Sequence, residues 1–315
     1  MNHYLPWLIL SGHVALLLFV DWFVLHKKDQ PNNPKKAIFE TLFFVVNALI
    51  FGGAVYWFFD AGLAVNPENL SPSIGVVKYI TGYIIELSLS VDNLFVIALI
   101  FAAYKIPSRY QHKLLFLGIV GAMLFRAILI SVGLILVHKI QYITIFFGLF
   151  LLYTAFNLLK KEEESESYQK NKGIAKYFNI SNQLDNGHFR TIVNGKRMFT
   201  ALFGALITIE FADLLFALDS IPAIFAVTTD PFIVFSSNIF AIMGLRSLYF
   251  LLANMLEKFK YLKYSVFSIL VFVALKLTTS HWFDIPEWFS LLFIGISLAM
   301  GVWVSSIKSK DSMTK

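Results

Sequence analysis

The 315-residue chain is too apolar for an ordinary soluble protein: 57% of its residues are hydrophobic and 15% are charged, whereas globular domains average about 45–50% and about 25%. It contains no cysteine, which excludes disulfides, a thiol nucleophile and thiolate metal sites. The formal net charge of +6 falls mainly in short connections between apolar blocks, which is typical of membrane topology and argues against a nucleic-acid partner.

Apolar blocks of about 20 residues recur along the chain, and this length crosses a bilayer core of about 30 Å. The first block lacks a basic leading region and a small-residue cleavage site, so we interpret it as a retained helix. The sequence predicts an all-α, polytopic membrane protein of about nine transmembrane helices, at residues 4–24, 38–58, 76–103, 114–137, 141–159, 199–228, 231–256, 262–280 and 287–307.

Basic residues mark alternate connections between these spans. The connections 25–37, 104–113, 160–198 and 257–263 are rich in Lys and Arg, as is the C-terminal tail, whereas the connections between them are not. Cytoplasmic loops carry the excess of Lys and Arg. The pattern therefore predicts an N-terminus outside and a C-terminus in the cytoplasm.

The one long connection, 160–198, differs in composition from its neighbours. Its start, KKEEESES, is acidic and indicates a flexible linker. Its end, NGHFRTIVNGKRMF, has Asn-Gly turn signals on both sides of a short apolar run, which predicts a small hairpin. A plain cytoplasmic tether is the alternative, and it is the favoured interpretation.

The third span, YIIELSLSVDNLFVIALIF at residues 83–101, carries polar residues in its middle. They are Glu86, Asp92 and Asn93. A carboxylate near the bilayer centre costs at least ~2.5–3.5 kcal/mol on insertion scales. Two of them on one helix indicate a functional site.

The sixth span repeats this pattern. Its segment DLLFALDSIPA places Asp213 six residues before Asp219, with the polar Ser220 directly after. Glu86, Asp92 and the polar Asn93 have the same spacing in the third span. Glu210 lies one turn before Asp213. Because the two spans run in opposite directions in the predicted topology, we expect an inverted-topology three-helix repeat, an arrangement common in secondary transporters.

The repeat divides the chain into five parts: peripheral transmembrane helices 1–2 within 1–58, a first repeat at 76–159, the cytoplasmic loop 160–198, a second repeat at 199–280, and the last transmembrane helix at 286–307.

The span after each acidic span contains a buried arginine. Arg126 and Arg246 each follow a glycine in an apolar run. They could neutralise the carboxylates of an empty site, or they could be permanent structural partners. Asp21 and Glu40 lie near predicted cytoplasmic helix ends and are interpreted as interfacial.

Antiparallel crossing of the two acidic spans predicts two levels of carboxylates. Glu86 would face Asp219, and Asp92 would face Asp213 and Glu210. Such a cluster cannot stay ionised without a cation, a shared proton or an arginine. Oxygen ligands suit hard divalent cations. The alternative is a polar network that only joins the helices.

Pro222 closes the acidic motif of the sixth span. It cannot donate to the carbonyl four residues back. We therefore expect a broken helix at 219–222, whose freed carbonyls would line the site.

These stretches resemble the TerC family of integral membrane proteins, and within it the alkali-inducible, Alx-type branch. The resemblance rests on TGYIIELSLSVDNLFV, on GIVGAMLFRAILI and on the long stretch 184–264, and it covers nearly the whole chain. It implies a relationship to the LysE transporter superfamily and export of Mn²⁺. The motif positions that would contact the metal are Glu86, Asp92, Asn93, Glu210, Asp213, Asp219 and Ser220.

The leading hypothesis is a secondary transporter that exports a divalent cation, Mn²⁺ by resemblance, across the bacterial plasma membrane, with proton exchange as one driving force. Its partners are the ion and the lipid bilayer, and no prosthetic group is expected. The alternatives are another cation, such as Ca²⁺ or Na⁺/H⁺, or a membrane assembly factor for other membrane or secreted proteins. An enzyme is not expected, since no nucleophile–base pair stands out. Ion selectivity and oligomeric state are left open.

Overall fold

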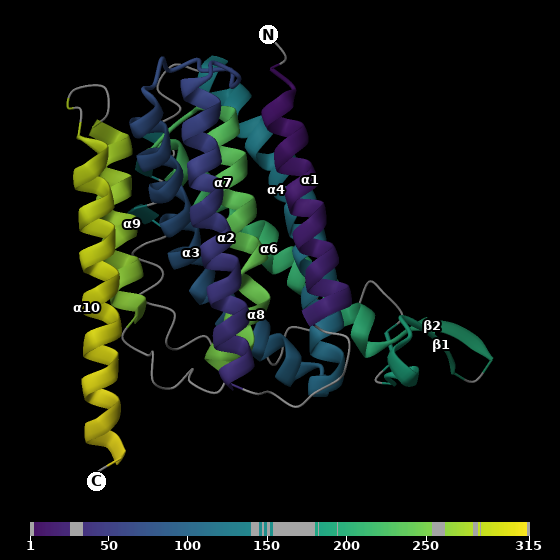
Figure 1. Ribbon diagram of the computed structural model, residues 1–315. Helices are drawn as coiled ribbons and strands as arrows, with labels where there is room; N and C mark the ends of the chain where they lie inside the picture. Colours follow the sequence, from purple (N-terminus) through teal and green to yellow (C-terminus); the bar gives the residue numbers. More distant parts are fainter. Residues whose placement is uncertain are drawn as a thin grey trace.

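A computed structural model shows a bundle of long helices lying side by side, with a small hairpin at one end (Figure 1). The structure describes residues 3–25, 34–139, 145–146, 148–149, 152–153, 180–181, 183–193, 195–253, 262–279, 283 and 285–313.

The described helices coincide with most of the predicted spans. Within the described residues, five segments are long and apolar enough to cross a membrane: Leu5–Phe23, Lys35–Asp60, Ser108–Leu136, Ala201–Phe225 and Pro231–Leu251. The helices are α1 (Leu5–Val20), continued by the π-helical turn η1 (Asp21–Leu25), α2 (Pro34–Asp60), α3 (Pro72–Ala103), α4 (Ser108–Lys139), α6 (Ala201–Phe225), α7 (Pro231–Met243), α8 (Leu245–Ala253), α9 (Leu262–Thr279) and α10 (Glu287–Met313). The predicted span 141–159 lies mostly outside the described residues, so the number nine stays a prediction.

α3 is the central helix and packs against α2, α6, α7 and α10. It runs antiparallel to α6. Tyr104, just after α3, bonds Thr208 near the start of α6 (Oη to Oγ1, 3.1 Å). At the other end, a Cβ on Gly82 would lie 3.0 Å from Cδ1 of Ile224, near the end of α6. The antiparallel directions of α3 and α6 agree with the topology predicted from the sequence. An internal symmetry between the two predicted repeats stays a prediction.

α6 contradicts the expected break at Pro222. The helix runs from Ala201 to Phe225 with the proline inside it. A proline removes one hydrogen bond and crowds the carbonyl four residues back, yet the helix continues past Pro222, and the N–H of Ala226 bonds the carbonyl of Pro222 at 3.3 Å. The prediction of a broken helix is therefore wrong. Asp213 and Ser220, seven residues apart, consequently share one face of α6.

Large apolar side chains point outward from the bundle. Leu8, Ile50, Leu124 and Trp303 are each more than 60% exposed. A soluble monomer rarely exposes extended apolar surfaces. The outer surface is consistent with immersion in lipid.

The structure contains the hairpin that the Asn-Gly pattern allows, in place of the favoured interpretation, a plain tether. Strand β1 (Arg190–Val193) pairs antiparallel with β2 (Lys196–Phe199), with Val193 opposite Lys196. Gly195 in the turn has a φ of +74°, a left-handed conformation that glycine adopts without steric cost. The acidic start of the loop lies outside the described residues.

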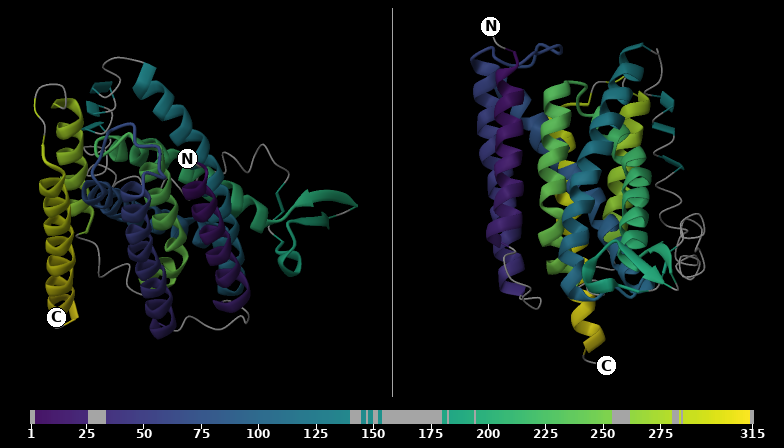
Figure 2. Two further views of the ribbon diagram at one scale, coloured as in Figure 1. Left: turned by 45° about the horizontal axis from the view of Figure 1, so that its top comes forward. Right: turned by 90° about the vertical axis from the view of Figure 1, so that its right-hand side faces the viewer.

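The two ends of the bundle carry different segments. The N-terminus lies at one end and the C-terminus at the other, with the hairpin at the C-terminal end (Figures 1 and 2). The connection from α2 to α3 lies at the N-terminal end (Figure 1). The hairpin and this connection should therefore lie on opposite sides of a membrane.

This arrangement can be tested with the cysteine-free chain. Ala61→Cys, at the N-terminal end, and Lys196→Cys, on the hairpin, are both at exposed positions. In sealed vesicles of one orientation, a membrane-impermeant maleimide should label only one of them, and permeabilisation should expose the other. Labelling of both before permeabilisation would contradict the arrangement.

Candidate cation site

A buried arginine on α4 joins two carboxylates from different helices. Arg126 donates to both oxygens of Asp213 on α6, with Nη2 3.0 Å from Oδ1 and Nε 3.3 Å from Oδ2. Its Nη1 contacts Glu86 of α3 and lies 3.3 Å from Oγ of Ser220. Glu86 and Arg126 are each 1% exposed. Three helices therefore meet at one guanidinium.

A second set of donors holds Glu86. Nδ2 of Asn238, on α7, lies 2.9 Å from Oε2 of Glu86. The hydroxyl of Ser90, one turn along α3, lies 3.2 Å from Oε1. Asn238 is fully buried, and its Oδ1 has no hydrogen-bond partner among the described residues. Neither Asn238 nor Ser90 was predicted, because helical spacing alone does not show which side chains meet across helices.

Glu210 brings a third carboxylate to the same region. It packs under Gly121 of α4, where an added Cβ would collide with both of its carboxylate oxygens. Oε2 of Glu210 is buried and has no hydrogen-bond partner within the described part of the chain. The glycine at position 121 thus leaves room for the carboxylate of Glu210. Unlike Asp213, one turn away on α6, Glu210 has no hydrogen bond to Arg126 among the described residues.

The charges of this cluster do not balance. Glu86, Asp213 and Glu210 would carry three negative charges when ionised, against one positive charge on Arg126. Buried like charges repel strongly because the surrounding dielectric is low. The cluster must therefore hold protons or a further cation.

The predicted geometry of two carboxylate levels is only partly visible. Arg126 brings Glu86 and Asp213 to one guanidinium, although the sequence assigned them to different levels. Asp92 and Asp219 belong to α3 and α6, but their side chains lie outside the described part. Asn93 is buried, at 5% exposure. Among the described residues, no group of three or more His, Cys, Asp or Glu side chains is arranged to hold a metal ion.

Arg246 has a different role from Arg126. It pairs with the carboxylate of Asp21, and its Nη2 lies 3.1 Å from the backbone oxygen of that residue. Asp21 and Glu40 are each 3% exposed, so they face neighbouring helices, while their predicted depth at the membrane interface stays a prediction. Hydropathy placed them near helix ends but could not show that α1 and α2 turn them inward. Arg246 ties α8 to the end of α1.

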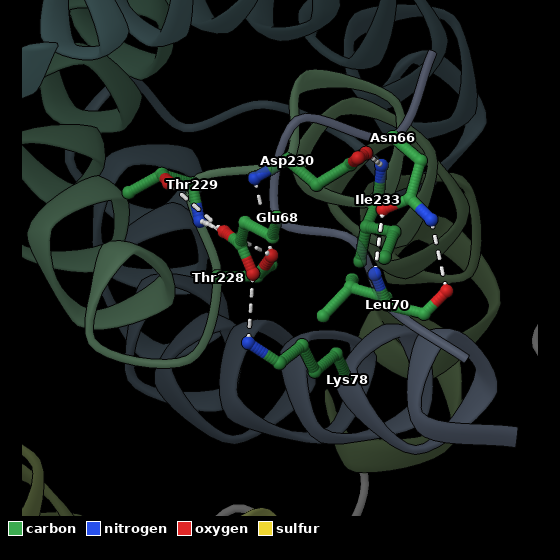
Figure 3. A network of polar contacts seen from close by, with 8 residues as sticks. All are labelled: Asn66, Glu68, Leu70, Lys78, Thr228, Thr229, Asp230 and Ile233. Carbon is green, nitrogen blue, oxygen red and sulfur yellow. Dashed lines mark hydrogen bonds and ion pairs between the residues drawn. The ribbon is translucent and has the colours of Figure 1, made fainter. Parts of the chain in front are cut away.

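A polar network at the N-terminal end of the bundle was also missed (Figure 3). Glu68, between α2 and α3, accepts hydrogen bonds from Thr228 Oγ1 at 3.0 Å and Thr229 Oγ1 at 2.9 Å. Its other oxygen lies 2.8 Å from Nζ of Lys78. Burial alone would raise the pKa of Glu68, but Lys78 and Thr229 outweigh it and lower the pKa. The network joins the start of α3 to the turn between α6 and α7.

Asp230 begins α7 beside this network. Its Oδ1 caps the helix by accepting from the N–H of Ile233 at 3.0 Å. Burial raises the pKa of Asp230 to about 6, and the nearby Glu68 adds to the shift. Its Oδ2 has no hydrogen-bond partner among the described residues.

A sequence profile for the "Integral membrane protein TerC family" matches residues 72–313. The chain belongs to the TerC family. This TerC chain is 41% identical over 311 residues to an uncharacterized membrane protein of Myxococcus xanthus, covering 98% of this chain and 94% of the relative. It is 38% identical over 307 residues to an uncharacterized membrane protein of Rickettsia felis, covering 96% and 98%.

A further relative of this TerC chain carries a functional name. The chain is 38% identical over 298 residues to the "Putative membrane-bound redox modulator Alx" of Escherichia coli, covering 92% of this chain and 89% of the relative. No solved structure matches the chain. The comparisons establish an integral membrane protein of the TerC family.

The capping carboxylate gives a prediction about stability. Asp230→Asn keeps a capping acceptor but removes the charge. A group whose folded pKa is raised destabilises the fold once it ionises, so wild-type stability falls as the pH rises from about 4 towards 6. Asp230→Asn should be more stable above pH 6, by roughly 1–3 kcal/mol. The difference should disappear towards pH 4.

Thermal unfolding of the protein in detergent across this pH range measures the effect. Asp60→Asn, at an exposed carboxylate, is the control and should change nothing. Asp230→Ala should be about 1 kcal/mol less stable than Asp230→Asn, because it loses the cap as well as the charge. Equal stability of wild type and Asp230→Asn at pH 8 would contradict the assignment.

Proposed function

We propose that this chain is a secondary transporter that exports a divalent metal cation, with Mn²⁺ as the substrate, across the bacterial plasma membrane. The observation that carries the proposal is the buried cluster in which Glu86 and Asp213 share the guanidinium of Arg126 while Glu210 lies one turn from Asp213 without such a contact. Intramembrane carboxylates are rare and mark ion or proton pathways. A cluster with excess negative charge is suited to receive a cation.

The ligand atoms favour a hard ion. Every polar side chain in the cluster other than Arg126 offers oxygen, and the chain has no cysteine that could supply a soft thiolate. Carboxylate and amide oxygens suit Mn²⁺, Mg²⁺ and Ca²⁺. Asp92 and Asp219 remain predicted ligands beside the described acids, with Asn93 and Ser220 as neutral ones.

Arg126 stabilises the cluster of carboxylates when no metal ion is bound. With no metal bound, its guanidinium pairs with both Glu86 and Asp213 and offsets one of their two negative charges. A divalent cation that binds these carboxylates must displace the guanidinium or bind beside it. The arginine is then a tethered charge whose position depends on whether the site is filled.

The orientation of the protein in the membrane follows from the placement of basic residues, whereas the direction of transport depends on the ion gradients. Lys and Arg concentrate in connections on the hairpin side of the bundle, which the positive-inside rule assigns to the cytoplasm. The network around Glu68 then faces outward. No Walker-type phosphate loop occurs in the sequence, which supports an ion gradient as the driving force.

The name of the Alx relative points to another class of function. A redox modulator that works by thiol–disulfide exchange needs cysteine, and this chain has none. Transport of Ca²⁺ or Na⁺/H⁺ and a role as a membrane assembly factor also compete with Mn²⁺ export. An assembly factor should tolerate neutral replacements of the central acids, whereas a transporter should not. No described residue set suggests an enzyme.

Glu210→Gln is the sharpest test of the central acids. Glu210 has no hydrogen bond to Arg126 in the described structure, so its neutralisation leaves no buried arginine unpaired. Expression and thermal stability should stay near wild type. Metal flux into liposomes should fall by at least the roughly 10–100-fold that follows loss of a supporting partner.

The flux assay should compare Mn²⁺, Ca²⁺, Mg²⁺ and Zn²⁺ in parallel. Asp60→Asn, at an exposed carboxylate outside the cluster, is the matched control and should transport at the wild-type rate. Wild-type flux in Glu210→Gln would remove Glu210 from the transport site. The absence of flux for all four metals in the wild type would reject the transport proposal.

Metal binding should also release protons. The cluster has more carboxylates than positive charges, so an empty site retains at least one proton that a divalent cation displaces. Calorimetric titration with Mn²⁺ should give heats that depend on the ionisation enthalpy of the buffer, and binding should tighten as the pH rises. Identical heats in all buffers would mean that no proton is exchanged on binding.

A further inference from the structure

The hairpin is held firmly against the helices at its base. Nζ of Lys113, on α4, donates to the carbonyl of Gly187 at 2.9 Å and lies 4.7 Å from the ring centroid of Phe189. Oγ1 of Thr200, at the start of α6, donates to the carbonyl of His188 at 2.7 Å. The orientation of the hairpin is therefore fixed relative to the bundle.

One face of the hairpin combines basic and apolar side chains. Arg190 pairs with Phe199 and Ile192 pairs with Arg197, and residues paired across strands share a face. Arg190, Ile192 and Arg197 are exposed, with Ile192 at 69%. A large exposed isoleucine between two arginines is suited to a surface that is both apolar and anionic.

This face continues the outward apolar surface of α6. The ring of Phe199 stacks on that of Phe203, with centroids 4.1 Å apart. Along α6, Phe211 lies about 80° around the helix from Phe203, and Leu215 lies about 40° further round. Phe211 and Leu215 are 47% and 44% exposed. The hairpin face is therefore joined, through Phe199 and Phe203, to a helix that carries exposed apolar side chains.

The hairpin also lies at the depth of a membrane surface. It projects sideways from the bundle, at the level where the helices end (Figures 1 and 2). A segment at this level and outside the bundle meets the headgroup region of the bilayer. Amphipathic segments with basic residues bind at this boundary.

We propose that the hairpin is a lipid-binding element whose Arg190–Ile192–Arg197 face binds anionic phospholipid headgroups of the surrounding bilayer. Ile192 enters the boundary between headgroups and acyl chains, and Arg190 and Arg197 bind lipid phosphates through charge-assisted hydrogen bonds. This binding is independent of the ion that the protein carries.

The chain itself contains another candidate occupant of this face. The acidic stretch 162–166 could pair with the arginines, and it lies outside the described residues. It offers no apolar partner for Ile192, however, since its sequence is EEESE. The apolar continuity with α6 favours lipid.

A single spin label can separate these possibilities. Ile192→Cys in the full cysteine-free chain is labelled with a nitroxide and reconstituted into vesicles of phosphatidylcholine and phosphatidylglycerol in equal parts. Oxygen, which partitions into lipid, should relax the label more strongly than a water-soluble nickel chelate. Lys196→Cys, on the opposite face of the hairpin, should show the reverse.

Charge variants test the role of the arginines. Arg190→Gln with Arg197→Gln, in the Ile192→Cys background, should shift the label towards the aqueous reagent by about fivefold in equilibrium for each arginine, the equivalent of about 1 kcal/mol each. The double Arg→Lys variant should retain the wild-type depth. Pure phosphatidylcholine should resemble the Gln variant.

Three results would overturn the proposal. The first is a label at position 192 as accessible to nickel as the label at position 196. The second is a label at position 192 shielded from both reagents, which would indicate a protein partner such as residues 162–166. The third is an unchanged depth in the Gln variant and in pure phosphatidylcholine, which would remove any role for anionic lipid.

Discussion

The ion-paired arginine on α4 is the constraint on which the centre of the bundle depends. A guanidinium cannot be buried among apolar helices without partners, and removing one member of a buried pair typically costs about 3–5 kcal/mol. Arg126 therefore requires Glu86 on α3 and Asp213 on α6 to lie within its reach, which fixes the relative rotation of three helices. Asn238 extends the same requirement to α7, because the second oxygen of Glu86 also needs a donor. The two carboxylates are held in place by the one positive charge that they share.

The two arginines show how similar sequence contexts acquire different surroundings. Both follow a glycine in an apolar run, yet Arg126 faces the central acids whereas Arg246 faces Asp21 on η1. The difference arises because α1 lies outside the predicted repeats and reaches α8 with its own carboxylate. The first helix is thus more than a lipid-facing addition. It supplies a carboxylate to Arg246 in the second half of the chain.

The parts of the fold that depend on local pattern could be predicted from the sequence. The length of the apolar segments predicted the helices, and the Asn-Gly turn indicated the hairpin, because both signals arise from neighbouring residues. The contact between Asn238 and Glu86 could not be predicted, because it depends on the relative rotation of α3 and α7. The two residues are 152 positions apart in the sequence. The predicted break at Pro222 was wrong for a related reason. The rule for proline gives the hydrogen bond that is lost, but it does not say whether the rest of the helical turn persists.

The polar bonds between the two antiparallel acidic helices are distributed unequally along their length. At the N-terminal end, Glu68 joins Lys78 of α3 to the turn after α6 through an ion pair and several hydrogen bonds. At the hairpin end, Tyr104 and Thr208 provide a single hydrogen bond among those described between α3 and α6. Separation of these helices at the N-terminal end must break the ion pair and rehydrate a partly buried carboxylate, whereas separation at the hairpin end breaks one neutral bond. In the described conformation, polar bonds therefore join α3 and α6 more strongly at the N-terminal end of the bundle than at the hairpin end. The central carboxylates lie between these two ends.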